Sequence, residues 1–175
     1  MEQVGHLPHL WLHQDQPPVT GATEEFSFGV SPFAAWSTGG NLGSARYSLA
    51  GAGTQTAALA FAGRNPGVSP STLNATEEYG GTSWTAGGNM GTARYSLAGC
   101  GTQTAALAFG ANSPVNPEGV TEEYGGTSWT NGGTMGTGRG GLAGAGTQTA
   151  GLAAAGGTST SVTATEEYDG SSWTN

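Results

Sequence analysis

Residues 90–109 read Met90-Gly91-Thr92-Ala93-Arg94-Tyr95-Ser96-Leu97-Ala98-Gly99-Cys100-Gly101-Thr102-Gln103-Thr104-Ala105-Ala106-Leu107-Ala108-Phe109. Two short apolar runs in this stretch, residues 94–101 and 104–109, flank Thr102-Gln103. Gly and Thr interrupt both runs, which makes helix formation unfavourable. Short apolar runs on either side of a polar turn instead predict a β-hairpin.

A second hairpin is predicted directly downstream. Residues 120–124 and 128–130 flank Gly125-Gly126. Glycine adopts the positive φ angles of a tight turn without steric cost, so this pair favours a two-residue connection between strands. The two hairpins together predict four short strands in one unit.

The unit recurs along the chain. The four residues Trp36, Trp84, Trp129 and Trp173 are spaced 48, 45 and 44 residues apart. Spacings of 48 and 45 residues also separate Arg46, Arg94 and Arg139, as well as Gln55, Gln103 and Gln148. A Thr-Glu-Glu triplet followed by Phe or Tyr occupies residues 23–26, 76–79, 121–124 and 165–168. The sequence therefore predicts an all-β fold of tandem four-stranded antiparallel β-units of 44–48 residues, the size of one propeller blade.

The order of these residues resembles the kelch motif. Residues 90–94, the small apolar hairpin, a glycine-containing loop, residues 122–124 and Trp129 follow one another as in that family. A Met-Pro-x-x-Arg-like segment, a Gly-Gly pair, a Tyr and a Trp recur there, once per four-stranded blade. The resemblance covers residues 22–175 and implies kelch-like propeller blades, with a stack of β-units as the alternative. The Gly-Gly pair corresponds to Gly156-Gly157, and reads Ala62-Gly63 and Gly110-Ala111 in the other units, while Phe26 replaces the Tyr.

The count of hairpins predicts an incomplete set of blades. We divide the chain into a flexible leader (1–21), a half repeat (22–41), repeat 1 (42–89), repeat 2 (90–134) and repeat 3 (135–175). Four Trp-containing hairpins accompany only three Gln-containing ones, which makes three and a half blades. Closed propellers have at least four blades, so we expect head-to-tail self-association, part of a longer array, or a stack with exposed ends.

Composition excludes several classes of partner. The chain has 4 Lys and Arg residues against 12 Asp and Glu residues, a formal net charge of −8. This charge disfavours nucleic acid and anionic lipid. No run approaches the roughly 20 apolar residues of a membrane-spanning helix, so no membrane insertion is expected. The N-terminus also lacks the features of a signal peptide, so an export signal would lie outside this sequence.

Paired glutamates supply eight of the twelve acidic residues. Neighbours on a strand point to opposite faces, so the two carboxylates of a pair do not converge on one ion or one substrate. We expect the inward glutamate to be neutralised by the in-register Arg46, Arg94 or Arg139. The outward ones should form a solvated acidic ladder that could hold Ca²⁺, the one cofactor considered. The candidate calcium ligands are Glu24, Glu77, Glu78, Glu122, Glu123, Glu166 and Glu167.

Large aromatic residues are predicted to anchor a core that is otherwise mostly Ala and Gly. The structural anchors are Trp36, Trp84, Trp129, Trp173, Tyr79, Tyr124 and Tyr168, together with the three arginines. The alternative for the tryptophans is a platform for sugar stacking. Cys100 stands where the other repeats have Ala52 and Ala145, which indicates a small buried strand residue.

No catalytic residue emerges from the sequence, and we expect a protein that is not an enzyme. His6, His9 and His13 have spacings compatible with zinc or nickel, but they lie in a Pro-containing leader that favours a flexible arm. No Ser, His and Asp set recurs, and the Gly-rich stretches lack the context of a phosphate-binding loop. A metal-radical enzyme would need His and Tyr ligands that the repeats do not supply together.

The loops between the second and third strands differ in length and composition, as recognition loops on a repeated frame do. They are residues 63–74, 111–119 and 157–163. Our functional hypothesis is a non-catalytic structural or adhesive repeat protein that forms extended head-to-tail assemblies, extracellular or on a virion surface. The alternative is a glycan-binding propeller module that uses these loops.

Overall fold

The computed structural model describes residue 21 and residues 24–27, 35–112, 117–157 and 159–175. Residues 1–20 of the predicted leader, which include its three histidines, lie outside the described part. Every regular element in the described part is a β-strand. No described helix is long and apolar enough to cross a membrane.

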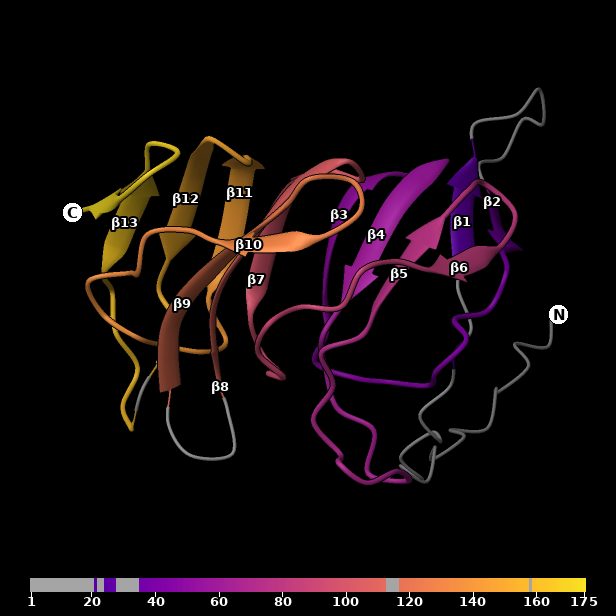
Figure 1. Ribbon diagram of the computed structural model, residues 1–175, viewed down its shortest axis with the longest axis horizontal. Coiled ribbons are helices and arrows are strands. Elements are labelled where there is room, and N and C mark those ends of the chain that lie inside the picture. Colours follow the sequence, from indigo (N-terminus) through magenta and orange to yellow (C-terminus); the bar gives the residue numbers. More distant parts are fainter. Residues whose placement is uncertain (1–20, 22–23, 28–34, 113–116, 158) are drawn as a thin grey trace, which may run out of the picture.

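Three four-stranded antiparallel sheets follow one another along the chain (Figure 1). In each sheet the strands lie side by side in sequence order, so each repeat forms a sheet without a crossover. This confirms the all-β fold with tandem four-stranded units. Repeat 1 contains β3 (Ala50–Thr54), β4 (Ala57–Phe61), β5 (Thr76–Tyr79) and β6 (Trp84–Ala86); repeat 2 contains β7 (Ala98–Thr102), β8 (Ala105–Asn112), β9 (Pro117–Tyr124) and β10 (Trp129–Asn131); repeat 3 contains β11 (Ala143–Thr147), β12 (Ala150–Ala154), β13 (Thr165–Tyr168) and β14 (Trp173–Thr174).

The half repeat forms the outer hairpin of such a unit. Strands β1 (Glu24–Ser27) and β2 (Ala35–Thr38) pair so that Phe26 lies opposite Trp36. In the complete sheets the corresponding Tyr lies opposite the corresponding Trp, as Tyr79 does opposite Trp84. In the described part, β1 and β2 form a two-stranded sheet, so this hairpin lacks the first two strands of a repeat.

Two details differ from the sequence prediction. The first strand of repeat 2 begins at Ala98 rather than Arg94, because Arg94 turns into the sheet end to bind polar groups and Ser96 has a φ of 54°. In repeat 3 the equivalent of Ala62-Gly63 is Ala155-Gly156, one residue before the Gly156-Gly157 pair that the sequence comparison assigned. Ala155 (φ 56°) and Gly156 (φ 94°) adopt the left-handed backbone that Ala62 (φ 62°) and Gly63 (φ 100°) adopt in repeat 1.

Adjacent sheets pack mainly through their first strands, because β7 lies against both β3 and β11. Small residues allow this close approach. A Cβ atom at Gly99 would lie 2.5 Å from Cζ of Phe61, and one at Gly144 would lie 2.7 Å from Cζ of Phe109. One buried cluster accordingly combines residues of repeats 1 and 2, and another combines residues of repeats 2 and 3. The core therefore lies between sheets, and neighbouring repeats complete each other.

The described sheets form an open row. Figure 1 places the β1–β2 hairpin at one end and β13 at the other, with β7 near the middle. Each internal sheet thus has a neighbour on both sides, whereas one face of the last sheet does not.

Candidate functional site

The contact between consecutive repeats, which we call the joint, uses the same residue types twice. In the joint between repeats 1 and 2, Gln103 Nε2 donates to the carbonyl oxygens of Ala58 (3.0 Å) and Tyr79 (2.7 Å). Both N–H groups of the amide therefore have acceptors in the preceding sheet. The periodicity of the sequence identifies this glutamine as a repeated residue but predicts no contact for it. In the next joint, Gln148 Nε2 donates to the carbonyls of Ala106 (3.3 Å) and Tyr124 (2.7 Å).

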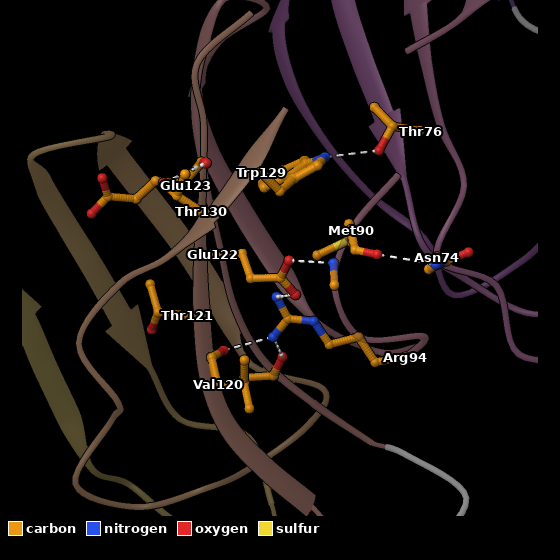
Figure 2. Close-up of polar contacts among 12 residues, drawn as sticks. Asn74, Thr76, Met90, Arg94, Val120, Thr121, Glu122, Glu123, Trp129 and Thr130 are labelled. Carbon is orange, nitrogen blue, oxygen red and sulfur yellow. Dashed lines mark hydrogen bonds and ion pairs between the residues drawn. The ribbon is translucent and has the colours of Figure 1, made fainter. Parts of the chain in front are cut away.

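The tryptophan that recurs in each repeat also contributes to the joint. Trp129 Nε1 donates to Thr76 Oγ1 of the preceding repeat at 2.9 Å (Figure 2). Its ring centroid lies 4.9 Å from that of Phe61, in an edge-on arrangement. The structure therefore uses this half-buried indole to bind one sheet to the next. The following joint has Trp173 bonded to Thr121 Oγ1 (2.8 Å), with its ring centroid 4.9 Å from that of Phe109.

The first tryptophans have a different environment. Trp84 Nε1 donates to the carbonyl oxygen of Gly40 at 3.1 Å, just after the β1–β2 hairpin. The Trp36 side chain lies outside the described part of the structure. The half repeat is thus joined to repeat 1 through a backbone acceptor, in contrast to the threonine hydroxyl of the later joints.

A tyrosine and a glutamate form the third contact of each joint. Tyr124 donates its hydroxyl proton to Glu78 Oε1, and Tyr168 donates to Glu123 Oε1 at 2.6 Å. The predicted solvated acidic ladder of outward glutamates is wrong for Glu78 and Glu123. They are half-buried acceptors for the next repeat. Glu167, their equivalent in repeat 3, is exposed.

These phenols predict a loss of stability in alkali. Burial, the larger cause, and the hydrogen bonds to Glu78 and Glu123, the second cause, together raise the pKa of Tyr124 and Tyr168 from 10.0 to about 12. A raised folded-state pKa contributes stability that is complete below the unfolded value and is lost as the pH rises through the folded value. We therefore expect the free energy of unfolding in urea to fall between about pH 10 and pH 12.

The matched variants separate these two tyrosines from general alkaline unfolding. The double variant Tyr124→Phe, Tyr168→Phe should show a shallower fall than the unaltered chain over the same pH range. Tyr47→Phe, at an exposed tyrosine, should leave the fall unchanged. Identical pH profiles for the double variant and the unaltered chain would contradict the role assigned to the two phenols.

The predicted arginine–glutamate pairs are present in all three repeats. Arg94 Nη2 lies 3.2 Å from Glu122 Oε1, and Nη1 donates to the carbonyls of Gly110 (3.1 Å) and Val120 (2.6 Å) (Figure 2). Glu122 Oε2 also accepts from the backbone N–H of Gly91 at 2.7 Å. Each pair thus ties the segment before the first strand to the middle of its own sheet. The other two are Arg46 with Glu77 (2.5 Å) and Arg139 with Glu166.

The described residues form no ready-made calcium site. They contain no cluster of three or more His, Cys, Asp or Glu side chains placed to hold a metal ion. The inward glutamates bind arginines, and Glu78 and Glu123 bind tyrosines. The Glu24 side chain and the histidines of the leader lie outside the described part. Calcium binding stays an untested prediction.

Cys100 is the small buried strand residue that the sequence predicted. It is 7% exposed, and its thiol donates to the carbonyl oxygen of Thr147 in the next repeat at 3.5 Å. Burial raises the pKa of the thiol to about 11. The thiolate is the reactive form of cysteine, so the protonated Cys100 thiol is expected to be unreactive at neutral pH.

The variable loops bring together residues that the sequence did not single out. The Arg64 guanidinium lies over the Tyr95 ring, 4.8 Å from its centroid. Arg64 also pairs through its backbone with Tyr47, whose side chain is 40% exposed, and Tyr95 pairs with Asn112. Loops of repeats 1 and 2 thus share one surface that carries two aromatic rings and a cation.

The last sheet carries an uncovered copy of the joint. We define the end face as Leu152, Thr165 and Glu167 with the carbonyl oxygens of Gly151 and Tyr168. Leu152 is 38% exposed, whereas its equivalents Leu59 and Leu107 are 1% and 0% exposed. Thr165 and Glu167 are exposed as well. A cavity of about 310 Å³ on this face is lined by Ala150, Gly151, Leu152, Glu167 and Tyr168.

No protein-family model and no curated protein matches the chain. Its function is therefore inferred from its own residues.

Proposed function

We propose that the chain is a non-catalytic structural or adhesive repeat protein that associates head to tail. The observation that carries this proposal is the end face of repeat 3. It presents the acceptor groups that bind a following repeat in both internal joints, without a repeat to cover them in the described structure. Two different complementary ends make a heterologous contact, which closes into a ring or continues as a filament.

The energetics of the joint support association. Each joint contains two glutamine hydrogen bonds, a tyrosine–glutamate bond and an indole bond. A net gain of about 0.5 to 1.5 kcal/mol is typical for one such bond. Covering Leu152, which is 38% exposed, adds a part of the roughly 1.5 to 3 kcal/mol that full burial of a leucine supplies. In a repeat protein these neighbour contacts supply much of the stability, so an uncovered end favours a partner.

The kelch-like propeller assignment is part of the same proposal. Four antiparallel strands in sequence order, with the first strands of adjacent sheets packed together, support blades of this type. The acidic charge and the glycine-rich repeats also suit an extracellular or virion-surface location, which we propose as the place of action.

A glycan-binding module is the second candidate. The observation in its favour is the surface formed by Tyr47, Arg64 and Tyr95 on the variable-loop side. Flat aromatic faces beside a hydrogen-bond donor are suited to a sugar ring.

Sedimentation velocity over a wide concentration range, with negative-stain electron microscopy of the same samples, tests the first proposal. We expect species larger than the monomer that grow with concentration, seen as rings or filaments. A chain that stays monomeric at its highest soluble concentration would contradict head-to-tail association. If that monomer also binds immobilised glycans, the second candidate is favoured.

A further inference from the structure

We propose that the end face of repeat 3 binds the turn around Gln55 of a second copy of this chain. The inference rests on the proposed head-to-tail function and specifies the two surfaces that meet. Gln55 would take the place that Gln103 and Gln148 take in the internal joints. Its amide would donate to the carbonyl oxygens of Gly151 and Tyr168.

The end face contains the polar acceptors of a joint. The register of the sheets makes Gly151 the equivalent of Ala106, and Tyr168 the equivalent of Tyr124. The carbonyls of Ala106 and Tyr124 are the ones that accept from Gln148. Thr165 corresponds to Thr121, the acceptor for an indole N–H, and Glu167 corresponds to Glu123, the acceptor for a phenol. A surface with these four acceptors matches a repeat of this same type.

The complementary donor is found at the other end of the chain. Gln55 lies in the turn between β3 and β4, is exposed, and makes no side-chain hydrogen bond to a described residue. Gln103 and Gln148 both bind two carbonyls of the preceding repeat. The described residues supply no such repeat before Gln55, because β1 and β2 form a two-stranded sheet in the described part of the chain. It is therefore the in-register glutamine whose amide is open to a second copy.

Two substitutions make this contact more open than the internal joints. Gly151 occupies the position of Ala58 and Ala106, and Ala154 occupies the position of Phe61 and Phe109. The cavity of about 310 Å³ lies beside Gly151. Without a phenylalanine ring, the end face cannot repeat the edge-on contact that Phe61 makes with Trp129. We therefore expect a reversible contact, weaker than either internal joint.

The β1–β2 hairpin has a defined part in this contact. It occupies the place of the third and fourth strands of a preceding repeat, and Trp84 bonds to Gly40 beside it. An incoming repeat 3 would bring β13 and β14 to the same place, so the hairpin must move aside when a second copy docks.

Two full-length variants test the contact. Gln55→Glu replaces the amide donor with a carboxylate that would face two carbonyl oxygens, and Leu152→Arg places a charge on the end face. Each should raise the dissociation constant for self-association at least tenfold in sedimentation equilibrium. At a concentration where the unaltered chain is monomeric, neither should lower the melting temperature, because both residues are exposed. Gln103→Glu is the matched control and should lower the melting temperature, since its amide is bound within the chain.

Mixing the two variants provides a sharper readout. Gln55→Glu copies keep an intact end face, and Leu152→Arg copies keep an intact Gln55 turn. An equimolar mixture should restore one contact and form a heterodimer that does not grow further. A mixture that stays monomeric would overturn the assignment of the two surfaces. If the intact chain associates and both variants associate equally well, the assignment of the two surfaces is wrong, but head-to-tail association is still supported. If the intact chain never associates, both proposals are wrong.

Discussion

Replacing Arg94 with Ala is expected to lower the free energy of unfolding by about 3 to 5 kcal/mol. The guanidinium is fully buried and binds Glu122 together with the carbonyls of Gly110 and Val120. Its removal leaves a carboxylate that is 1% exposed without its cationic partner. A buried charge without a partner is among the most destabilising changes a folded chain can carry. Urea denaturation at neutral pH measures the loss.

Arg64→Ala provides the internal control. Arg64 is half-buried and its guanidinium lies over the Tyr95 ring, a contact worth about 0.5 to 2 kcal/mol. Equal losses for the two arginine variants would contradict the role assigned to the buried pair. Combining Arg94→Met with Glu122→Met should recover part of the loss, because no unpaired charge then stays buried.

Because the indole is half-buried, replacing Trp129 with Ala is expected to lower the free energy of unfolding by up to about 3 to 5 kcal/mol, the range for a fully buried aromatic side chain. The indole contacts Phe61 and Thr76 of repeat 1 and Tyr124 of its own repeat. Its loss should therefore uncouple repeat 1 from repeat 2. We expect a broader denaturation transition in addition to a lower midpoint, because repeats that are less coupled unfold less cooperatively.

Trp129→Phe separates the ring from its hydrogen bond. A phenylalanine keeps most of the contact with Phe61 but cannot donate to Thr76, so it should cost about 1 kcal/mol. Circular dichroism melts and urea titrations of both variants measure the difference. If Trp129→Ala unfolds with the midpoint of the unaltered chain, the indole is not a joint residue.

The sequence alone was sufficient to predict the strands, the hairpins and the ion pairs within a repeat. Alternating apolar runs and Gly-Gly turns are local signals, so the β5–β6 type of hairpin could be recognised in every unit. The pairing of Arg94 with one glutamate of the 122–123 pair also followed, since an inward carboxylate requires a cation and one arginine recurs in register with it. The structure identified that glutamate as Glu122.

Only the tertiary structure decided which side chains join one repeat to the next. Gln103 and its acceptor Ala58 are separated by 45 residues, as are Tyr168 and Glu123. A separation close to the repeat length cannot show whether a side chain faces its own sheet or the neighbouring one, because both possibilities have the same period. The approach of the sheets at Gly99 and Phe61 settled that question. In this packing Glu78, predicted to be a solvated surface charge, accepts a hydrogen bond from the next repeat. The same packing leaves the end face of repeat 3 uncovered in the described structure.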